Sequence, residues 1–380
     1  MYFPQFNTIG LPEIFTIIAG VGFVFIVIHY IINYATFSFF KKNYIEEGTT
    51  NIPISVIICA RNEDDNLTEF LPKVLTQNYQ NFEVIVVNDC SFDNTDTVIE
   101  EFSKIFPNLH KANIKEDAYY KHGKKFAMLV GIKKAQYDNL VFTDADCYPN
   151  SDNWLNEMAK GFTVNKKIVL GYGAYQKMPG LLNKLIRFDC FIIAVQYLSA
   201  AIKTKAYMGV GRNLAYSKEL FFKMKGFSTH YHINSGDDDL FVNAASTNIN
   251  TNICVSTDSI TYSKPKVKFK DWRLQKARHI TTAPLYNSNS KLKLTYGYFA
   301  QYFFYLSLIP LFFQLNTLLV FASLFILKSI IFIILLNNAA KKLNEKDLLI
   351  RGVFLELILL FIYPIFHLTK LIYKPAKWTN

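Results

Sequence analysis

Two aspartates separated by one residue, Asp144 and Asp146, directly follow a short apolar run that is typical of a buried strand. Side chains on an extended backbone point to the same side at every second residue, so both carboxylates can face one cation. Mg²⁺ or Mn²⁺ prefers oxygen ligands and is commonly shared between protein carboxylates and substrate phosphates. The pair therefore predicts a metal site that holds a nucleotide diphosphate, although such a pair alone is more often a turn or a helix cap.

The apolar run 54–60 ends in side chains suited to contact with a nucleoside. The residues at this point are Ala60, Arg61, Asn62 and Glu63. Their charged and amide groups can hydrogen-bond a nucleobase or a ribose at the edge of a sheet. Ordinary capping of the following helix explains them equally well.

A second apolar run, 83–88, is followed by Asp89 and then by a polar turn. Asp89 can accept a hydrogen bond from a base or a ribose hydroxyl. Asp93 and Thr95, further along the turn, suit capping of the next helix. The run therefore predicts a second nucleoside contact beside the first.

Charged residues begin two further helix-like stretches. Lys124 follows a glycine, and its ammonium group and the backbone N–H groups of a helix start attract a phosphate. Asp237, Asp238 and Asp239 place three carboxylates before an apolar helix, and such crowding raises the proton affinity that a general base requires. A solvated lysine and acidic helix capping are the alternative interpretations.

These residues lie in a chain with two apolar ends. Of its 380 residues, 51% are hydrophobic and 16% aromatic, and the excess is concentrated at 11–37 and at about 296–369. The formal charge of +11 favours anionic partners, and because no segment resembles a nucleic-acid module, we expect phosphorylated substrates and lipid headgroups. Five cysteines without a C-x-x-C pair indicate reduced thiols in a cytoplasmic compartment.

The middle of the chain predicts an α/β domain. Strand-like runs alternate with helix-like stretches, an order typical of a mostly parallel central sheet with ligands at the carboxyl ends of its strands. The strand-like runs are 54–60, 83–88, 140–144 and 168–172, and the helix-like stretches are 66–77, 95–106, 124–135 and 152–162.

The apolar ends predict a membrane protein with three parts. We expect an N-terminal transmembrane helix within 1–40, a cytoplasmic domain over 41–290 and a C-terminal transmembrane region over 291–380. Lys41 and Lys42 follow the first apolar stretch at once, so the positive-inside rule places the middle domain in the cytoplasm.

The C-terminal region contains two clear spans, 296–315 and 317–336, and a less certain third segment. Arg351 and Glu356 lie inside this segment, 348–369, so it either crosses the membrane or lies in the interface. The stretch 179–202 likewise reads as an interfacial helix below the site or as a buried helix of the domain.

Taken together, these motifs resemble those of the family-2 inverting glycosyltransferases, whose nucleotide-sugar-binding domain has the GT-A fold. The resemblance spans about 52–280. The matching segments are Ala60 to Glu63, Asn88 to Thr95, Gly123 to Ala127, the pair Asp144 and Asp146, the loop Gly209 to Asn213, and Gly236 to Leu240. It implies a nucleotide diphosphate sugar as donor, bound by Ala60, Arg61, Glu63, Asp89, Lys124 and Asp144, with Mg²⁺ or Mn²⁺ on Asp144 and Asp146.

Two departures from the family pattern affect the site. Gly236 stands where the family's E-D-x-x-L motif has glutamate, so the resemblance assigns the catalytic base to Asp237, with Asp238 as the alternative. The Q-x-x-R-W signature of processive polysaccharide synthases appears here as Gln275, Arg278 and His279, with histidine in place of tryptophan. Gln275 and Arg278 remain able to close over the sugar diphosphate.

The resemblance implies sugar transfer to a glycan or lipid-linked acceptor at the cytoplasmic face of a membrane, in the synthesis of a cell-surface polysaccharide or glycolipid. Membrane lipids are expected partners and nucleic acid is not. Two alternatives remain at this stage: a polyprenyl-phosphate sugar transferase, which needs no general base, and a non-catalytic membrane scaffold with the same fold.

Overall fold

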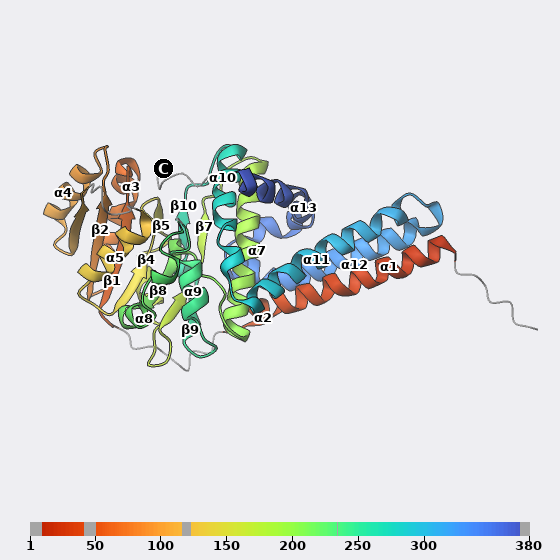
Figure 1. Cartoon of the computed structure of the whole chain (residues 1–380), viewed down its shortest axis with the longest axis horizontal. Coiled ribbons are helices and arrows are strands. Elements are labelled where there is room, and N and C mark those ends of the chain that lie inside the picture. Colours follow the sequence, from red (N-terminus) through yellow and green to blue (C-terminus); the bar gives the residue numbers. More distant parts are fainter. Residues whose placement is uncertain (1–9, 42–50, 116–122, 234, 373–380) are drawn as a thin grey trace, which may run out of the picture.

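A seven-stranded sheet forms the centre of the α/β domain in the computed structural model, which describes residues 10–41, 51–115, 123–233 and 235–372 (Figure 1). The strand order is β3-β2-β1-β4-β8-β6-β9, and within it only β8 runs antiparallel to its neighbours. The strands are β1 (Ile54–Ala60), β2 (Phe82–Asp89), β3 (Leu109–Ile114), β4 (Asn139–Phe142), β6 (Ile168–Leu170), β8 (Leu214–Ser217) and β9 (Thr251–Ile253). The predicted α/β domain with a mostly parallel sheet is thus confirmed.

Both faces of the sheet are buried, which explains why its central strands are continuously apolar. Alternate residues of β1 enter two different cores: Ile57 packs with α5, and Val56 packs with α3. The helices of the domain are α3 (Asp64–Leu75), α4 (Thr95–Ile105), α5 (Lys124–Lys134), α6 (Trp154–Ala159), α7 (Leu181–Lys203), α8 (Lys218–Lys223), α9 (Asp239–Ala245) and α10 (Phe269–Ile280).

A second, three-stranded sheet stands beside the first and shapes the far wall of the site. Its order is β5 (Cys147–Pro149), β10 (Thr261–Ser263) and β7 (Gly173–Tyr175). Each strand has three residues, too few for a recognisable alternation of apolar and polar side chains. The chain enters β5 directly after the Asp144 and Asp146 pair, so the small sheet holds the pair from one side.

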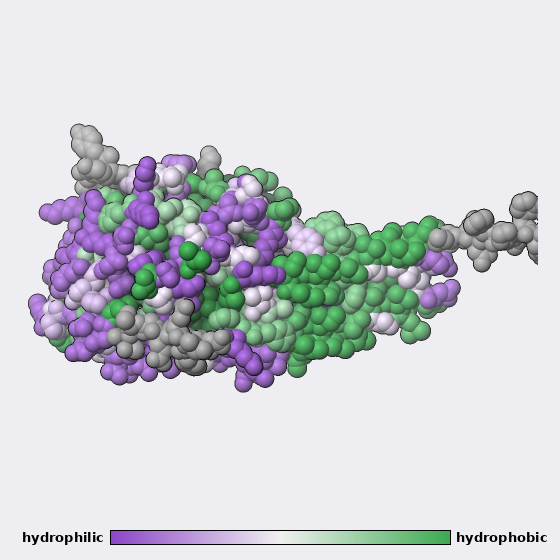
Figure 2. Space-filling view, turned by 90° about the horizontal axis from the view of Figure 1, so that it is seen from below, coloured by the Kyte–Doolittle hydropathy of each residue, from purple (hydrophilic) through white to green (hydrophobic). Residues whose placement is uncertain are grey.

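Three long helices form a bundle that projects from the domain (Figure 1). They are α1 (Leu11–Tyr30), continued by a π-helical turn (Ile31–Ala35) and α2 (Thr36–Phe39), α11 (Ser288–Phe312) and α12 (Leu318–Lys342). Figure 2 shows that the bundle surface is apolar along most of its length, in contrast to the polar domain. The start of α1 and the α11–α12 turn lie at the far end of the bundle, and α2 lies at the domain end (Figure 1). Lys342, at the end of α12, donates hydrogen bonds to the backbone oxygens of Phe37 and Ser38 in α2.

Four helical segments in the described part of the chain are long and apolar enough to cross a membrane, judged by length and composition. They are Leu11–Phe39, Leu181–Lys203, Leu315–Lys342 and Lys346–Ile372. The second is α7, and most of its side chains are buried within the protein. The fourth contains α13 (Leu349–Ile372), which packs on α10, α12 and α7.

A buried polar cluster joins all the helices of the membrane-facing part. The carboxylate of Glu356 on α13 accepts hydrogen bonds from Tyr30 of α1 (2.8 Å) and Tyr305 of α11 (3.0 Å), and it forms an ion pair with Lys328 of α12. Glu356 is 6% exposed and Lys328 is fully buried. Each charge is therefore compensated inside the protein, as burial in an apolar region requires.

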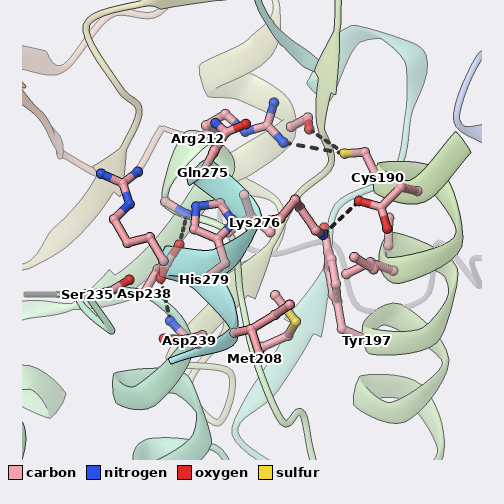
Figure 3. A pocket seen from close by; sticks show the side chains of 18 of the residues that line it. Cys190, Tyr197, Met208, Arg212, Ser235, Asp238, Asp239, Gln275, Lys276 and His279 are labelled. Carbon is pink, nitrogen blue, oxygen red and sulfur yellow. Dashed lines mark hydrogen bonds and ion pairs between the residues drawn. The ribbon is translucent and has the colours of Figure 1, made fainter. Parts of the chain in front are cut away.

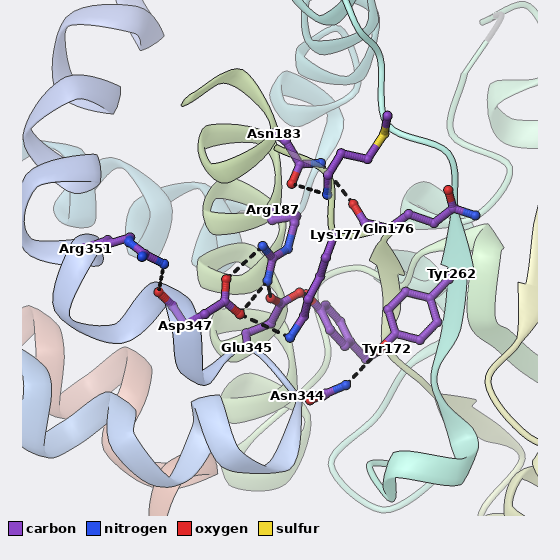
Figure 4. Close-up of polar contacts among 11 residues, drawn as sticks. Tyr172, Gln176, Lys177, Asn183, Arg187, Tyr262, Asn344, Glu345, Asp347 and Arg351 are labelled. Carbon is purple, nitrogen blue, oxygen red and sulfur yellow. Dashed lines mark hydrogen bonds and ion pairs between the residues drawn. The ribbon is translucent and has the colours of Figure 1, made fainter. Parts of the chain in front are cut away.

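A second polar network attaches the α12–α13 connection to the domain (Figure 4). Arg187 of α7 donates two hydrogen bonds to Asp347, at 2.8 and 2.9 Å, and a further one to Glu345. Lys177, which follows β7, pairs with Asp347 at 3.1 Å, and Tyr172 donates to Glu345 at 3.2 Å. These contacts fix the position of α12 and α13 relative to the α/β domain.

Candidate active site

The loops after β1 and β2 are bound to each other by side-chain hydrogen bonds. The Asn62 N–H donates to Ser91 Oγ (3.0 Å), and the Glu63 N–H donates to Thr95 Oγ1 (2.9 Å). The Asp93 carboxylate accepts hydrogen bonds from the backbone N–H groups of Asp64 and Thr95. Asp93 thus contacts the first residue of α4, but the Thr95 hydroxyl binds Glu63 and does not cap α4, so the predicted capping by Thr95 is wrong. These contacts join the ends of β1 and β2 into one rim.

Arg61 and Asp89 lie together at this rim. The Arg61 guanidinium is 3.7 Å from the Asp89 carboxylate, whose side chain is completely buried. Ala60, at the end of β1, is also buried. Within the described residues, these three do not line the central cavity, whereas Glu63 does. The nucleoside contacts expected of Ala60, Arg61 and Asp89 remain a prediction.

Asp144 and Asp146 converge where β4 passes into β5. Together with Cys147 they offer ligand atoms that all lie within 4.8 Å of one another. Burial and the nearby Asp144 carboxylate raise the pKa of Asp146, and burial likewise raises the pKa of the Cys147 thiol. Two crowded carboxylates fit a hard divalent cation, because a shared positive charge relieves their repulsion.

Lys124 connects this pair to the predicted base. Its ammonium nitrogen lies 2.7 Å from Asp144 Oδ1 and 3.2 Å from Asp237 Oδ2. Burial disfavours the charged ammonium, but the carboxylates of Asp144 and Asp237 prevail and raise the pKa of Lys124. Burial likewise opposes ionisation of Asp237, and Lys124 nevertheless lowers the pKa of this carboxyl. Lys124 and Asp237 are therefore both charged at neutral pH.

Asp238 and Asp239 differ from Asp237 in their contacts. Asp238 accepts hydrogen bonds from the backbone N–H groups of Gly211 and Asp239, each at 2.7 Å. Burial and the carboxylates of Asp237 and Asp239 raise the pKa of Asp238 to about 7. The Asp239 carboxylate accepts hydrogen bonds from the Thr282 hydroxyl and, at 2.6 Å, from the Tyr286 hydroxyl. Asp239 therefore anchors the connection between α10 and α11.

The backbone at Gly236 explains why glycine replaces glutamate in the acidic motif. Gly236 has φ of +95°, in the left-handed region that residues with a side chain rarely adopt. A Cβ atom there would lie 2.4 Å from Leu240 Cδ1. The glycine lets the chain turn sharply before α9, and this turn directs Asp237 toward Lys124.

A cavity of about 730 Å³ joins these groups to α10. Glu63, Lys124, Asp144, Asp146, Asp237, Asp238, Gln275 and Arg278 are among its lining residues. Figure 3 shows Gln275, Lys276 and His279 on α10 facing the cavity, with Cys190 and Tyr197 of α7 on the opposite side. The structure thus brings together the predicted metal carboxylates, both candidate bases and the α10 pair, which are widely separated in sequence.

Two residues of the cavity were not predicted from the sequence. Arg212 lies over the Tyr175 ring, 4.1 Å from its centroid, and donates hydrogen bonds to Ala174 O and Ser263 Oγ. The Asp189 carboxylate, on α7, forms an ion pair with Lys276 Nζ at 2.7 Å. Arg212 directly follows the glycine-rich loop Gly209 to Gly211, which is the one sequence signal that points to it. Asp189 lies in a mostly apolar helix, and a charged residue in such a helix is the sequence signal that could have pointed to it.

The fold and the site define a nucleotide-sugar-binding domain of the GT-A type. Residues 55–224 match the family Glycosyl transferase family 2. Over these residues, which make up less than half of the chain, it carries a family 2 glycosyltransferase domain, and the resemblance inferred from the motifs between Ala60 and Asn213 is confirmed. The assignments made to Asp237, Asp238, Gln275 and Arg278 lie beyond the matched residues and remain predictions.

Curated relatives match this domain over part of their length. A poly-beta-1,6-N-acetyl-D-glucosamine synthase from Staphylococcus epidermidis is 33% identical over 131 residues, 34% of this chain and 29% of the synthase. A 4,4'-diaponeurosporenoate glycosyltransferase from Staphylococcus haemolyticus is 34% identical over 125 residues, 33% of this chain and 32% of that enzyme. The matched region thus spans less than a third of either relative.

One solved structure is similar over nearly the whole chain. A mannosyltransferase from Pyrobaculum calidifontis, in complex with GDP-Man and Mn²⁺, superposes with a TM-score of 0.58 at 18% identity. The similarity covers 95% of this chain and 99% of the mannosyltransferase. It establishes a shared fold that extends beyond the family 2 domain into the C-terminal helices.

Proposed function

We propose that this protein is an inverting, metal-dependent glycosyltransferase that moves a sugar from a nucleotide diphosphate sugar to a glycan or lipid-linked acceptor at the cytoplasmic face of a membrane. Its product would contribute to a cell-surface polysaccharide or glycolipid. The similarity to a poly-beta-1,6-N-acetyl-D-glucosamine synthase supports a polysaccharide product.

One observation carries the proposal: the Lys124 ammonium contacts both Asp144 and Asp237. A site for transfer from a sugar diphosphate needs a metal-binding carboxylate, a cation for the leaving diphosphate and a base for the acceptor within one cavity. Lys124 supplies the cation and lies between the Asp144 and Asp237 carboxylates. A scaffold without catalytic activity would not require this arrangement.

Each side chain then has a defined role. Asp144 and Asp146 would hold Mg²⁺ or Mn²⁺, which supplies charge neutralisation for the diphosphate when bound. Asp237 accepts the proton of an acceptor hydroxyl, whose oxygen forms a bond to the anomeric carbon as the bond to the diphosphate oxygen breaks. Attack on the face opposite the leaving group inverts the configuration. Lys124 and Arg278 stabilise the charge that develops on the departing diphosphate.

The proposed orientation follows from charge along the bundle. Lys341, Lys342 and Lys346 lie at the domain end of α12. The described residues at the far end, 10–14 and 312–318, contain no lysine or arginine. An excess of positive charge marks the cytoplasmic side of a membrane protein, so we place the catalytic domain there.

A donor screen tests the proposal. Full-length protein purified in detergent is incubated with radiolabelled UDP- and GDP-linked sugars, with Mn²⁺, with Mg²⁺ or with EDTA. We expect metal-dependent release of nucleotide diphosphate from at least one donor. If no donor is hydrolysed or transferred with either metal, the protein is a scaffold and the proposal fails.

A further inference from the structure

The cavity does not end at the catalytic carboxylates. It continues between α7, α10 and α11 and reaches side chains of α1 and α13, as its lining residues His29, Asn33, Gln301 and Tyr363 show. These residues belong to the helices that form and surround the bundle (Figure 1). The cavity thus extends from the metal carboxylates to the helices of the bundle.

The middle of the cavity is lined by tyrosines and amides. The residues that form it are Gln196, Tyr197, Tyr207, Tyr286, Tyr298 and Gln301. Aromatic faces with nearby hydrogen-bonding groups suit a ring that is apolar on its faces and polar at its edge. Tyr298 is 38% exposed, whereas Tyr197, Tyr207 and Tyr286 are buried, so Tyr298 has the most accessible ring of these tyrosines. A sugar ring has these properties.

Lys293 lies on the cavity wall at the membrane end. It is half-buried on α11, and no hydrogen bond or ion pair to it is found among the residues that the structure describes. The charged group that acts on it electrostatically is another cation, Lys203, at the end of α7. An uncompensated, half-buried ammonium beside a second cation favours an anion at this position.

The position of Lys293 separates it from the chemistry. Tyr286 contacts Asp239 directly, and α11 begins two residues after Tyr286. Lys293 lies six residues beyond the helix cap Asn287, a rise of about 9 Å toward the bundle. Lys293 and Asp237 line the same cavity, whose wall also contains these tyrosines and amides, so an anion held by Lys293 leaves room for a sugar between itself and Asp237.

From this order of groups we infer that the acceptor is a lipid-phosphate-linked sugar: its phosphate lies at Lys293, its lipid enters along the bundle, and a hydroxyl of its sugar reaches Asp237. The inference rests on the proposed function and specifies the acceptor class of the same site. It distinguishes this acceptor from an uncharged glycolipid, which gains nothing from Lys293. It also distinguishes it from a prenyl phosphate that itself attacks the donor, because that phosphate would have to lie at Asp237.

Photolabelling tests the inference on full-length protein in nanodiscs. The probe is a diazirine-bearing prenyl diphosphate linked to N-acetylglucosamine, compared with the same prenyl chain joined to the sugar by an uncharged glycosidic bond. Inorganic pyrophosphate serves as competitor, to separate a lipid-linked phosphate from a free one. Labelled peptides are mapped by mass spectrometry, and affinity is obtained from competition with unlabelled probe.

We expect the charged probe to label the first turns of α11 and to bind Lys293→Gln about 10- to 100-fold more weakly, the cost of losing a charged hydrogen bond. Lys293→Arg keeps the charge and should restore binding. Lys291→Gln, two residues away and exposed, is the matched control for the general attraction of lysines to lipid headgroups and should bind normally. Pyrophosphate should compete weakly, because it lacks the lipid and the sugar.

Equal binding of the charged and uncharged probes by the unmodified protein would overturn the inference, and this comparison needs no variant. Equal effects of Lys293→Gln and Lys291→Gln would also overturn it, as would transfer onto a prenyl phosphate that carries no sugar. The proposed function fails on different evidence, the absence of donor hydrolysis. A protein that hydrolyses a donor but binds both probes alike would retain the function and lose only this acceptor class.

Discussion

Replacement of Asp237 by asparagine isolates the proposed proton transfer from donor binding. Asp237 is 7% exposed, and asparagine has nearly the same volume, so the packing is preserved. Lys124 keeps its contact with Asp144 at 2.7 Å, so the cation that meets the diphosphate stays in place. The variant removes one negative charge from the site, and donor affinity is therefore expected to be retained or to increase.

The rate should respond differently from the affinity. A correctly placed general base contributes about 10²- to 10⁴-fold, which corresponds to about 2.7–5.5 kcal/mol of activation free energy. We expect Asp237→Asn to lose transfer by this factor. Single-turnover transfer of a radiolabelled sugar measures the rate, and calorimetric titration with the nucleotide sugar measures donor affinity.

The matched variant Asp238→Asn tests the assignment. Both oxygens of Asp238 already accept backbone N–H groups, which suits a residue that positions Gly211 and the start of α9. We expect a smaller loss of transfer than in Asp237→Asn. Full turnover in Asp237→Asn with loss in Asp238→Asn would refute the reasoning and move the base by one residue. Full turnover in both would remove the general base altogether and favour a phosphate nucleophile.

Three further outcomes follow from the structure. Asp146→Asn should raise the Mn²⁺ concentration needed for half-maximal donor hydrolysis at least about tenfold, and an unchanged metal titration would exclude Asp146 as a ligand. Lys328→Met leaves the Glu356 carboxylate buried without its cation and should lower the free energy of unfolding by about 3–5 kcal/mol, as measured by denaturant titration. Adding Glu356→Gln should recover most of this loss. No recovery in the double variant would contradict the pairing. Folding raises the pKa of Asp238 to about 7, so between pH 4 and 7 the folded protein holds a proton on this group that the unfolded chain has lost. The contribution of Asp238 to the free energy of unfolding therefore falls as the pH rises through this range. The melting temperature of Asp238→Asn relative to the unmodified protein should therefore increase from pH 5 to pH 8, whereas a constant difference would show that Asp238 keeps an ordinary pKa.

Much of the site could be predicted because its residues follow local patterns. Asp144 and Asp146 follow an apolar strand as a D-x-D motif, Lys124 begins a helix, and Asp237 directly precedes one. Such signals depend on a few consecutive residues. Parallel strands then bring their carboxyl ends to one edge, so strand order alone places the groups near one another.

Other features have no local signal. The strands of the small sheet are three residues long, and β8 is antiparallel within an otherwise parallel order. The stretch 179–202 remained ambiguous between an interfacial and a buried helix, because composition does not reveal what packs against a helix. The structure buries most of α7 and places Arg187 and Asp189 against partners from distant segments.

The amino-acid sequence by itself determined the kind of domain, the apolar segments and the residue types available for catalysis, since these depend on periodicity and on short motifs. Only the tertiary structure decided which carboxylate faces Lys124, why glycine is required at position 236, and how the cavity extends to Lys293. The physical reason is that pairing, backbone strain and enclosure arise from contacts between segments far apart in the chain. A sequence pattern contains the groups but not the distances between them.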